Sequence, residues 1–521
     1  MSEFQEIEIV LLPEELNSSE AQIREIEQAV GALNGRPFKM VKRSLDARKK
    51  PIIYRCKVQV WNGEIPKDEP SQWHFSPASF SKKVHIIGFG PAGMYAALSL
   101  LENGIQPIIW ERGKAVQERR RDLAAINKEK KMNPESNYCF GEGGAGTYSD
   151  GKLYTRSKKR GDVKRVIQSL IDHGADSRIA IDAHPHIGTN KLPGIIENIR
   201  QTILEFGGEI HFDTKLVDVE LNGNQIVRIQ NQHGNWEEIE TLVLATGHSA
   251  RDIFELFHRR NIFLEAKPFA LGLRIEHPQN LIDQIQYKQD ERGDDLPPSS
   301  YSLVTQAKGN GVFSFCMCPG GIIAPAATAH GEMVVNGWSP SKRNGKFANS
   351  GMVVTVNPEH WAHLESDYGS LAALEFQKQI EKRAFDATQS LAAPAQRMED
   401  FIQQRVSSDL PHCSYLPGLV SADLNKILPS FIAESLREGL IDFGKKMRGY
   451  RTNEAVLVGV ESRTSSPVRI PRDRETMRHL EIVNLYPCGE GPGYAGGIMS
   501  AALDGMAAVQ AMLQSEFNTN A

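Results

Sequence analysis

The sequence predicts an α/β fold, and three stretches carry that prediction. The first is HIIGFGPAG at 85–93, where an apolar run ends in glycines spaced G-x-G-x-x-G. The second is an alternating, strand-rich region at 209–250, and the third is the glycine-rich stretch GEGPGYAGG at 489–497. They indicate a strand–turn–helix unit near residue 90 whose closing strand and helix lie at the far end of the chain.

Length and composition limit the class of protein. The 521 residues suffice for two to four domains, with 40% apolar and 24% charged residues. A formal net charge of -4 gives no general attraction to nucleic acid or to an anionic membrane. Six cysteines in so long a chain indicate reduced thiols, and the acidic N-terminus does not resemble a signal peptide. We therefore expect a cytoplasmic protein with no membrane segment.

Residues 1–80 are predicted to form a separate module with its linker. Strands at 6–12, 38–45 and 51–61 with a helix at 19–33 give the order β-α-β-β, similar to half a ferredoxin-type sandwich. The Pro- and Ser-rich stretch 62–81 is the expected linker. The basic run KRSLDARKK at 42–50 suggests either a docking face for a partner or RNA, or, more commonly, a solvated surface.

The G-x-G-x-x-G stretch lies in the context that a dinucleotide site requires. A strand at 83–87 precedes it, a helix at 92–104 follows, and a second strand at 106–111 closes the unit. Glycines in such a unit allow the tight turn, the close approach of a pyrophosphate and the packing of helix on strand. The acid that ends the second strand suits a ribose hydroxyl and argues against a 2′-phosphate, hence against an NADPH site. The predicted contacts here are Gly88, Gly90, Pro91, Ala92, Gly93, Glu111 and Arg112.

A second glycine-rich stretch, NYCFGEGGAGTYSDGKL, follows at 137–153. Its glycines allow the backbone to press against a flat ring and a pyrophosphate, although many such stretches are simply flexible surface loops. The predicted cofactor contacts in this loop are Gly143, Gly144, Gly146, Thr147 and Ser149.

The region 209–250 reads as strands around an Asn-Gly turn at 222–223, followed by an apolar strand ending in Ala245, Thr246 and Gly247. This arrangement resembles the FAD-binding domain of the glutathione-reductase-like flavoproteins. The resemblance implies that Leu216 offers its backbone to the adenine.

The C-terminal stretch resembles the last signature of the same flavoproteins. A strand near 482–488 ends in Gly489 and Glu490, where that family usually has Asp, and a helix then runs from Gly496, Gly497 and Ile498 to about residue 513. Free N–H groups and the positive end of a helix dipole suit an anion. In the resembled fold they face the N1/O2 edge of the flavin, a group that NAD lacks, so the resemblance implies FAD.

The whole chain resembles a group of bacterial FAD-dependent dehydrogenases, sometimes described as NAD-utilising dehydrogenases. The stretches that carry the resemblance are GFGPAGMYAALSL, GEGGAGTYSDGKL, AHPHIGTNKL, KPFALGLRIEHPQ, FSFCMCPGG and GEGPGYAGGIMSAALDG. We find no second strand followed by a G-x-G-x-x-G turn, and no C-x-x-x-x-C near the first domain, unlike in two-dinucleotide disulfide reductases. The resemblance implies a fold and a cofactor, with NAD(P)H possible as a transient electron donor, but no substrate.

We therefore expect a glutathione-reductase-like FAD-binding Rossmann domain at 81–267, closed by residues 451–521 and interrupted by an α+β substrate domain at 268–450. Strands are predicted at 269–277, 301–306, 311–318 and 333–339, with a helix at 370–388. Such an inserted domain would cover the reactive face of the flavin.

Several side chains are candidates for substrate contact, although none can be assigned as a catalytic acid or base. Cys316 and Cys318, two apart on a predicted strand, would point to one side and form either a redox pair or, more commonly, buried packing. His184 and His186 suit proton transfer or a structural turn, and no metal site is predicted. Arg463 and Arg469 suit a carboxylate or phosphate, and Lys152 follows the glycine loop.

Two classes of function follow. The first is an FAD oxidoreductase that moves hydride through flavin N5 to or from a small, anionic substrate. The second is a flavoprotein that acts on or docks to a macromolecule through its N-terminal module. Neither the substrate nor the oligomeric state follows from the sequence, and nucleic acid is not an expected partner.

Overall fold

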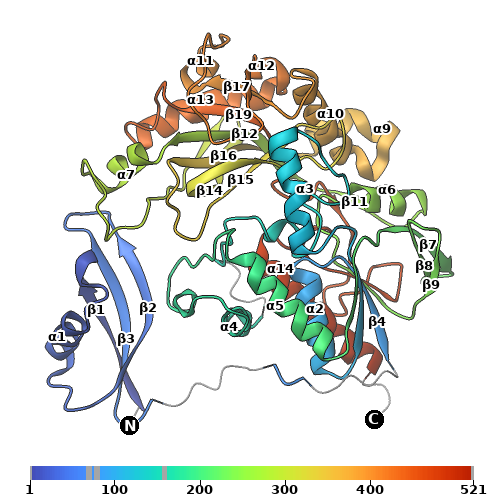
Figure 1. Cartoon of the computed structure of the whole chain (residues 1–521). Helices are drawn as coiled ribbons and strands as arrows, with labels where there is room; N and C mark the ends of the chain where they lie inside the picture. The colour runs from blue at the N-terminus through green and yellow to red at the C-terminus, as the bar shows by residue number, and fades with distance from the viewer. Residues whose placement is uncertain (1–2, 66–72, 76–81, 155–160, 518–521) are drawn as a thin grey trace.

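A computed structural model describes residues 3–65, 73–75, 82–154 and 161–517. Most of the predicted linker at 62–81 lies outside these residues. The described chain forms a small N-terminal unit, a domain built on a parallel sheet, and a domain built on a larger mixed sheet (Figure 1).

The N-terminal unit has the β-α-β-β order that the sequence indicates. Its sheet has the antiparallel order β1-β3-β2, and one face packs on the helix through Ile9, Leu11, Ile26 and Val58. The elements are β1 (Phe4–Leu11), η1 (Pro13–Glu15), α1 (Ser19–Val30), β2 (Phe38–Asp46) and β3 (Ile53–Trp61).

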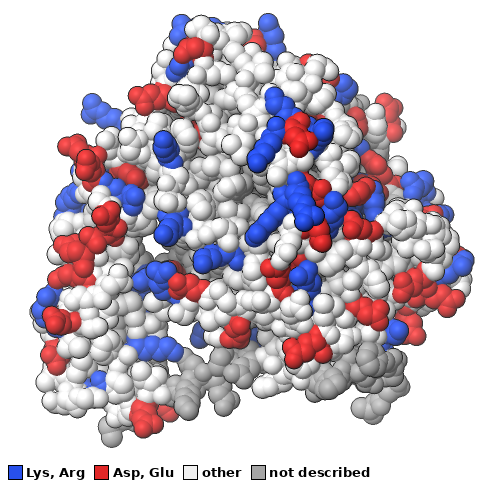
Figure 2. All heavy atoms as spheres, in the orientation of Figure 1, with Lys and Arg blue, Asp and Glu red and all other residues white. Residues whose placement is uncertain are grey.

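Part of the basic run at 42–50 is engaged inside the molecule rather than free. Arg43 pairs with Asp182 at 2.5 Å, and Lys50 donates to Gln289 at 2.6 Å. Ile52 packs with Tyr287 of the body. Figure 2 shows charges of both signs mixed over the visible face, with Lys and Arg gathered most densely over α3 (Val116–Glu129).

The parallel sheet has the order β21-β10-β4-β5-β6, so a strand from the C-terminus pairs beside one from the middle of the chain. The strands are short and their inner residues are buried, as expected for a sheet covered on both faces. They are β4 (Lys83–Ile87), β5 (Gln106–Trp110), β6 (Glu209–His211), β10 (Leu242–Leu244) and β21 (Leu485–Pro487).

Two helices, α2 (Pro91–Glu102) and α14 (Ile498–Met512), pack side by side on this sheet (Figure 1). The two helices are far apart in the sequence, and the residues between them include the whole inserted domain. A small sheet of β7 (Leu216–Asn222), β8 (Gln225–Asn231) and β9 (Trp236–Glu238) forms the predicted meander. The remaining elements of this domain are α3, η2 (Gly144–Gly146), α4 (Val163–Asp172), η3 (Ser177–Ala180), α5 (Leu192–Glu205), α6 (Arg251–Arg259) and η6 (Leu513–Phe517).

The second large sheet has the order β13-β14-β16-β12-β19-β17-β18, with β15 paired to β14. Its strands are β12 (Phe269–Pro278), β13 (Val304–Ala307), β14 (Asn310–Pro325), β15 (Val335–Trp338), β16 (Phe347–Val356), β17 (Ala393–Arg397), β18 (Leu419–Ser421) and β19 (Val456–Glu461). β19 lies past the predicted boundary at residue 450 and pairs with β12 and β17, so this sheet extends beyond that boundary.

Helices cover one side of this sheet, and α12 and α13 lie over it in Figure 1. They are α7 (Gln279–Tyr287), α8 (Pro358–Trp361), α9 (Glu365–Tyr368), α10 (Ala372–Asp386), α11 (Met398–Ile402), α12 (Leu424–Ile427) and α13 (Ser430–Lys446), with η4 (Ala362–Leu364) and η5 (Gly369–Leu371). The short strands β11 (Glu265–Ala266) and β20 (Val468–Arg469) pair where the two large domains meet. Within the described residues, no helix combines the length and the apolar composition that crossing a bilayer requires.

Candidate cofactor site

The turn between β4 and α2 admits only glycine at two positions. A Cβ on Gly88, whose φ is +101°, would lie 2.5 Å from the carbonyl oxygen of Ala245. A Cβ on Gly93 would lie 2.0 Å from the carbonyl oxygen of Gly88. These contacts are backbone to backbone and cannot be relieved by a rotamer change, so the turn requires both residues to lack a side chain.

The predicted glycine loop lies directly against the start of α2. Gly90 is the N-cap of that helix, and a Cβ placed on it would lie 3.9 Å from the Cα of Gly144. A Cβ on Gly146 would lie 3.5 Å from Pro91 and 3.2 Å from Ile498, the first residue of α14. The loop therefore connects the beginnings of the two helices that start at opposite ends of the sequence.

The closing glycine-rich stretch meets the end of β10. A Cβ on Gly489 would lie 2.9 Å from that of Ala92, and one on Gly491 would lie 3.0 Å from the carbonyl oxygen of Gly247. Gly497 is the N-cap of α14 with φ +103°, and both Gly496 and Gly497 are exposed. Three segments that the sequence placed in one cofactor site are thus brought together in space.

Glu111 is buried at the end of β5 and accepts three backbone hydrogen bonds. Its carboxylate accepts from the N–H groups of Phe89 at 2.8 Å, Gly113 at 2.9 Å and Gly141 at 3.0 Å. It therefore fixes the first glycine turn against the glycine loop, a role that the sequence did not indicate. Its predicted contact with a ribose stays a prediction.

Arg112, the neighbouring candidate, is held by acidic and aromatic groups. Its guanidinium pairs with Asp252 of α6 at 2.6 Å and lies 4.3 Å from the centre of the Phe140 ring. A side chain fixed in this way offers a rigid guanidinium edge beside the glycine loop.

Glu490 connects β10 to the start of α14. Its carboxylate contacts His248 Nδ1 at 3.0 Å and accepts a hydrogen bond from the N–H of Gly497. Burial alone would raise the pKa of Glu490, but the His248 and Gly497 contacts lower it. The carboxyl that the sequence assigned to a ribityl contact therefore already binds the helix N-terminus.

The side chains of the remaining cofactor candidates are consistent with a dinucleotide at this place. Thr246 Oγ1 is buried and has no hydrogen-bond partner in the protein. Thr147 and Ser149 donate to backbone carbonyls of their own loop, at 2.6 and 2.8 Å, and so shape it. Leu216 is buried at the start of β7. Two helix N-termini, glycine turns that exclude side chains and an unsatisfied hydroxyl fit a dinucleotide.

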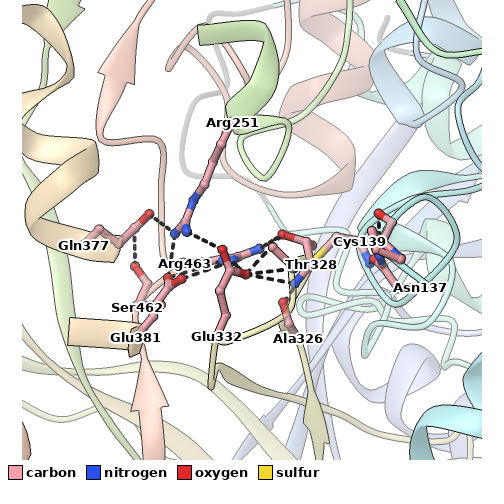
Figure 3. A network of polar contacts seen from close by, with 12 residues as sticks. Asn137, Cys139, Arg251, Ala326, Thr328, Glu332, Gln377, Glu381, Ser462 and Arg463 are labelled. Atoms are coloured by element: carbon pink, nitrogen blue, oxygen red, sulfur yellow. Dashed lines mark hydrogen bonds and ion pairs between the residues drawn. The ribbon is translucent and has the colours of Figure 1, made fainter. Parts of the chain in front are cut away.

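Arg463 is not available to bind a substrate anion, which corrects the sequence-based expectation. It contacts Glu332 at 2.5 Å, Glu381 at 3.1 Å and Thr328 at 2.6 Å, and its side chain is 4% exposed. Figure 3 shows this buried network, in which Arg251 of α6 reaches the same two carboxylates. The two arginines of this network are neutralised by Glu332 and Glu381, which are distant from them in the sequence.

Arg469, by contrast, lies partly exposed beside the closing glycine stretch. Its side chain is 42% exposed, faces Glu265 at 3.6 Å and lies 5.8 Å from the centre of the Tyr494 ring. Burial, followed by the charge of Arg469, lowers the pKa of the adjacent Lys267. Two cations therefore lie near the residues that open α14.

Lys152 and His186 lie together on paired backbone segments. They form an isolated antiparallel bridge, and His186 Nε2 contacts the carbonyl of Ser341 at 3.0 Å. Burial lowers the pKa of His186. His184 is exposed and packs edge-on against Tyr154, with ring centres 5.1 Å apart.

The two cysteines do not lie on a regular strand, which corrects the argument from strand alternation. The register of β14 against β16 shifts between Phe315 and Cys318, and Cys316 has φ +43°. An extra residue in the strand, a β-bulge, redirects side chains locally. The two residues nevertheless lie in contact, because the Cys318 thiol donates to the carbonyl of Cys316 at 3.3 Å.

Four charged residues around these thiols were not predicted from the sequence. They are Asp150, Arg274, Arg343 and Glu461. Arg274 and Glu461 lie in buried strands whose sequences are otherwise apolar. The only signal in the sequence that could have identified them is a charged residue within an apolar strand.

Comparison with known proteins gives a relative and two family matches. A protein of Clostridium beijerinckii named "Uncharacterized protein" is 39% identical over 499 residues, covering 91% of this chain and 92% of its own length. Residues 268–464 match the family "FAD-dependent protein, C-terminal domain-like", which supports FAD as cofactor. Residues 3–61 match a domain of unknown function, DUF8436.

Solved structures show only weak similarity. The tetracycline destructase Tet(51) has a TM-score of 0.32 and 13% identity, covering 84% of this chain and 83% of its own. CtdE in complex with FAD has a TM-score of 0.33 and 11% identity, covering 83% and 84%. Similarity of this size adds nothing to the functional argument.

Proposed function

Since the chain belongs to the family of the Clostridium beijerinckii protein and contains a domain of FAD-dependent proteins, we propose that it is an FAD-dependent oxidoreductase. Its FAD-binding unit would be of the glutathione-reductase-like type. The substrate would be small and anionic, and NAD(P)H would be a transient electron donor. Bound FAD would supply hydride transfer at its N5 atom.

The observation that carries the proposal is the meeting of three glycine-rich segments at the starts of α2 and α14. Gly90 and Gly144 approach closely, Gly146 lies against Ile498, and Gly491 lies against Gly247. Helix N-termini bind anions through free N–H groups and the helix dipole. One start would hold the pyrophosphate and the other the edge of the ring where negative charge develops.

An anionic substrate is supported by the cations beside these segments. Arg469 and Lys267 lie near the opening of α14, and Lys152 follows the glycine loop. Arginine provides a fixed fork of donors for a carboxylate or phosphate. The basic run of the N-terminal unit gives no comparable support for a macromolecular substrate, because Arg43 and Lys50 bind the body of the protein.

Purified protein should be yellow and should release FAD rather than FMN on heating. The reason is that the proposed contacts of Glu111 with a ribose and of Leu216 with an adenine need the adenosine half, which FMN lacks. The released flavin can be identified by chromatography against both standards. Recovery of FMN would contradict the proposed site.

Anaerobic addition of NADH or NADPH should bleach the flavin absorbance at saturating concentration. No second dinucleotide unit is present in the sequence, so binding of the nicotinamide should be weak and reduction should depend on its concentration. Stopped-flow absorbance measures that dependence. A flavin reduced by neither nucleotide, but reduced by dithionite, would remove NAD(P)H as donor.

A further inference from the structure

Cys316 occupies a strained position in the middle of a buried sheet. Its φ of +43° is in the left-handed region, which residues other than glycine adopt rarely. Such a residue is held there only when the surrounding structure imposes the conformation, and such outliers gather at functional sites. The bulge between Phe315 and Cys318 produces the strain and brings both thiols to one place.

Two cations lie against the thiols. Lys152 Nζ is 3.7 Å from Cys316 Sγ and also donates to the carbonyl of Met317. Arg274, which is fully buried, donates to the carbonyl of Cys316 at 2.8 Å and lies 3.6 Å from Cys318 Sγ. The same arginine is held by Asn349 and Glu461, so its position is fixed.

The other charged groups at this place are paired with each other. Asp150 contacts Arg343 at 2.6 Å and lies 3.9 Å from Lys152, and Glu461 pairs with Arg274 at 3.0 Å. The ammonium of Lys152 therefore lies at nearly equal distances from the Cys316 sulfur, 3.7 Å, and the Asp150 carboxylate, 3.9 Å, and Asp150 is itself paired with Arg343. A thiolate at Cys316 would be stabilised by this adjacent positive charge.

The two thiols differ in exposure and acidity. Cys316 is half-buried, whereas Cys318 is 0% exposed. The hydrogen bond from Cys318, followed by the charges of Lys152 and Arg274, lowers the pKa of Cys316 well below its ordinary value. The same hydrogen bond, followed by burial, raises the pKa of Cys318. Cys316 is thus the more exposed and the more acidic thiol of the pair, and Cys318 is the buried and less acidic one.

We propose that Cys316 and Cys318 form a redox-active dithiol, in which Cys316 attacks a disulfide and Cys318 resolves the mixed disulfide. Simple packing does not explain the arrangement. A buried cysteine that only fills space needs neither a left-handed backbone nor two adjacent cations, and the bulge and Lys152 both carry a cost without such a role.

The exchange balances with a low-molecular-weight disulfide as the oxidant. The Cys316 thiolate forms a bond to one sulfur, the disulfide bond of the small molecule breaks, and one thiolate leaves. Cys318 then gives up its proton, bonds to the Cys316 sulfur and expels the second thiolate, which takes up a proton from solvent or from Cys318. The protein loses two electrons as two thiols become one disulfide, and the small molecule is reduced to two thiols.

The pair deepens the proposed function by naming disulfides as a substrate class. Lys152 contacts Cys316 and follows the glycine loop six residues past Gly146, so one segment contributes both to the thiol site and to the candidate cofactor site. Passage of electrons between the dithiol and FAD rests on the proposed function. The thiol exchange does not, and protein from which flavin has been removed should still perform it.

The first test follows the thiols of the purified full chain by mass spectrometry. The protein is equilibrated with oxidised and reduced glutathione at graded ratios, and free thiols are then alkylated. We expect an intramolecular Cys316–Cys318 disulfide to form, and Cys318→Ser to retain glutathione on Cys316 instead. The control Cys413→Ser should behave like the wild type. If neither thiol is oxidised in the wild type at any ratio, the proposal is wrong.

The second test measures the acidity of Cys316 without any redox step. Iodoacetamide should label Cys316 rapidly at pH 7, and Lys152→Gln should slow this labelling severalfold, because loss of the ammonium raises the pKa of Cys316 and lowers its thiolate fraction. Lys164→Gln, which removes an equal charge on the exposed side of α4, should leave the rate unchanged. Equal rates in wild type and Lys152→Gln, or labelling of Cys316 no faster than Cys413, would overturn the proposal.

Discussion

Replacement of Gly93 by alanine should unfold the turn between β4 and α2 and abolish flavin binding. The added methyl would lie 2.0 Å from the carbonyl oxygen of Gly88, so strand and helix must separate. Overpacking of an interior usually costs 1–3 kcal/mol. A clash between two backbone segments should cost at least about 3 kcal/mol. Urea unfolding and the flavin content of the purified protein measure the two effects.

Two matched glycine variants distinguish folding from binding. A Cβ on Gly90 meets only the Cα of Gly144, at 3.9 Å, so Gly90→Ala should fold normally but bind FAD at least about tenfold more weakly, because that backbone must approach the pyrophosphate. Gly194 of α5 has open space around it, and Gly194→Ala should bind normally with stability equal or higher by up to about 1 kcal/mol. Normal flavin content in Gly93→Ala would contradict the site.

Replacement of Glu381 by glutamine should destabilise the protein by about 3–5 kcal/mol, the usual cost of leaving a buried charge without its partner. Glu381 is fully buried and contacts both Arg251 and Arg463, as Figure 3 shows. The amide would leave two guanidiniums to share Glu332. Chemical unfolding at pH 7 measures the loss. Asp386→Asn, which breaks an exposed pair on the same helix, should change stability by less than about 1 kcal/mol.

Glu381 should also make the stability of the protein depend on pH in the acid range. Burial alone would raise the pKa of Glu381, but Arg251 and Arg463 outweigh it and lower the pKa from 4.5 to about 2. Its contribution to stability is therefore complete above pH 4.5 and is lost as the pH falls toward 2. The stability difference between wild type and Glu381→Gln should shrink over that interval. A difference that stays constant with pH would show that charge is not the cause.

The parts of the fold that local pattern defines were predicted from the sequence. The strand, turn and helix around Gly90 depend on neighbouring residues and on three glycines, so their spacing carries the information. The Asn-Gly turn at 222–223 and the glycine-opened helix at 497 are local in the same sense.

What the sequence could not show depends on contacts between distant segments. Arg463 appeared suited to an anion, but Glu332 and Glu381, from separate elements, neutralise it. Cys316 and Cys318 appeared to lie on a regular strand, but pairing with β16 introduces the bulge. Strand β16 itself was missed, although Asn344-Gly345 before it and Asn357-Pro358 after it are turn signals that mark its ends.

The split of the parallel-sheet domain across the chain affects how the protein can be assembled during synthesis. α2 is complete at Glu102, but its partner α14 begins at Ile498, about 400 residues later. At translation rates of roughly 5–20 residues per second, that separation lasts on the order of 20–80 s. Contacts between such distant segments must also overcome the entropy of closing a long loop.

During that interval α2 lacks α14, the helix with which it packs most extensively, although ten of its residues are buried in the finished protein. The inserted domain, whose strands lie between residues 269 and 461, can complete its sheet earlier. A nascent chain should therefore carry one folded domain and one open, aggregation-prone half of the parallel-sheet domain until β21 and α14 leave the ribosome. A chain that terminates early, after β19, would have a parallel-sheet domain that permanently lacks β21 and α14. Such a chain should depend on chaperones and be degraded.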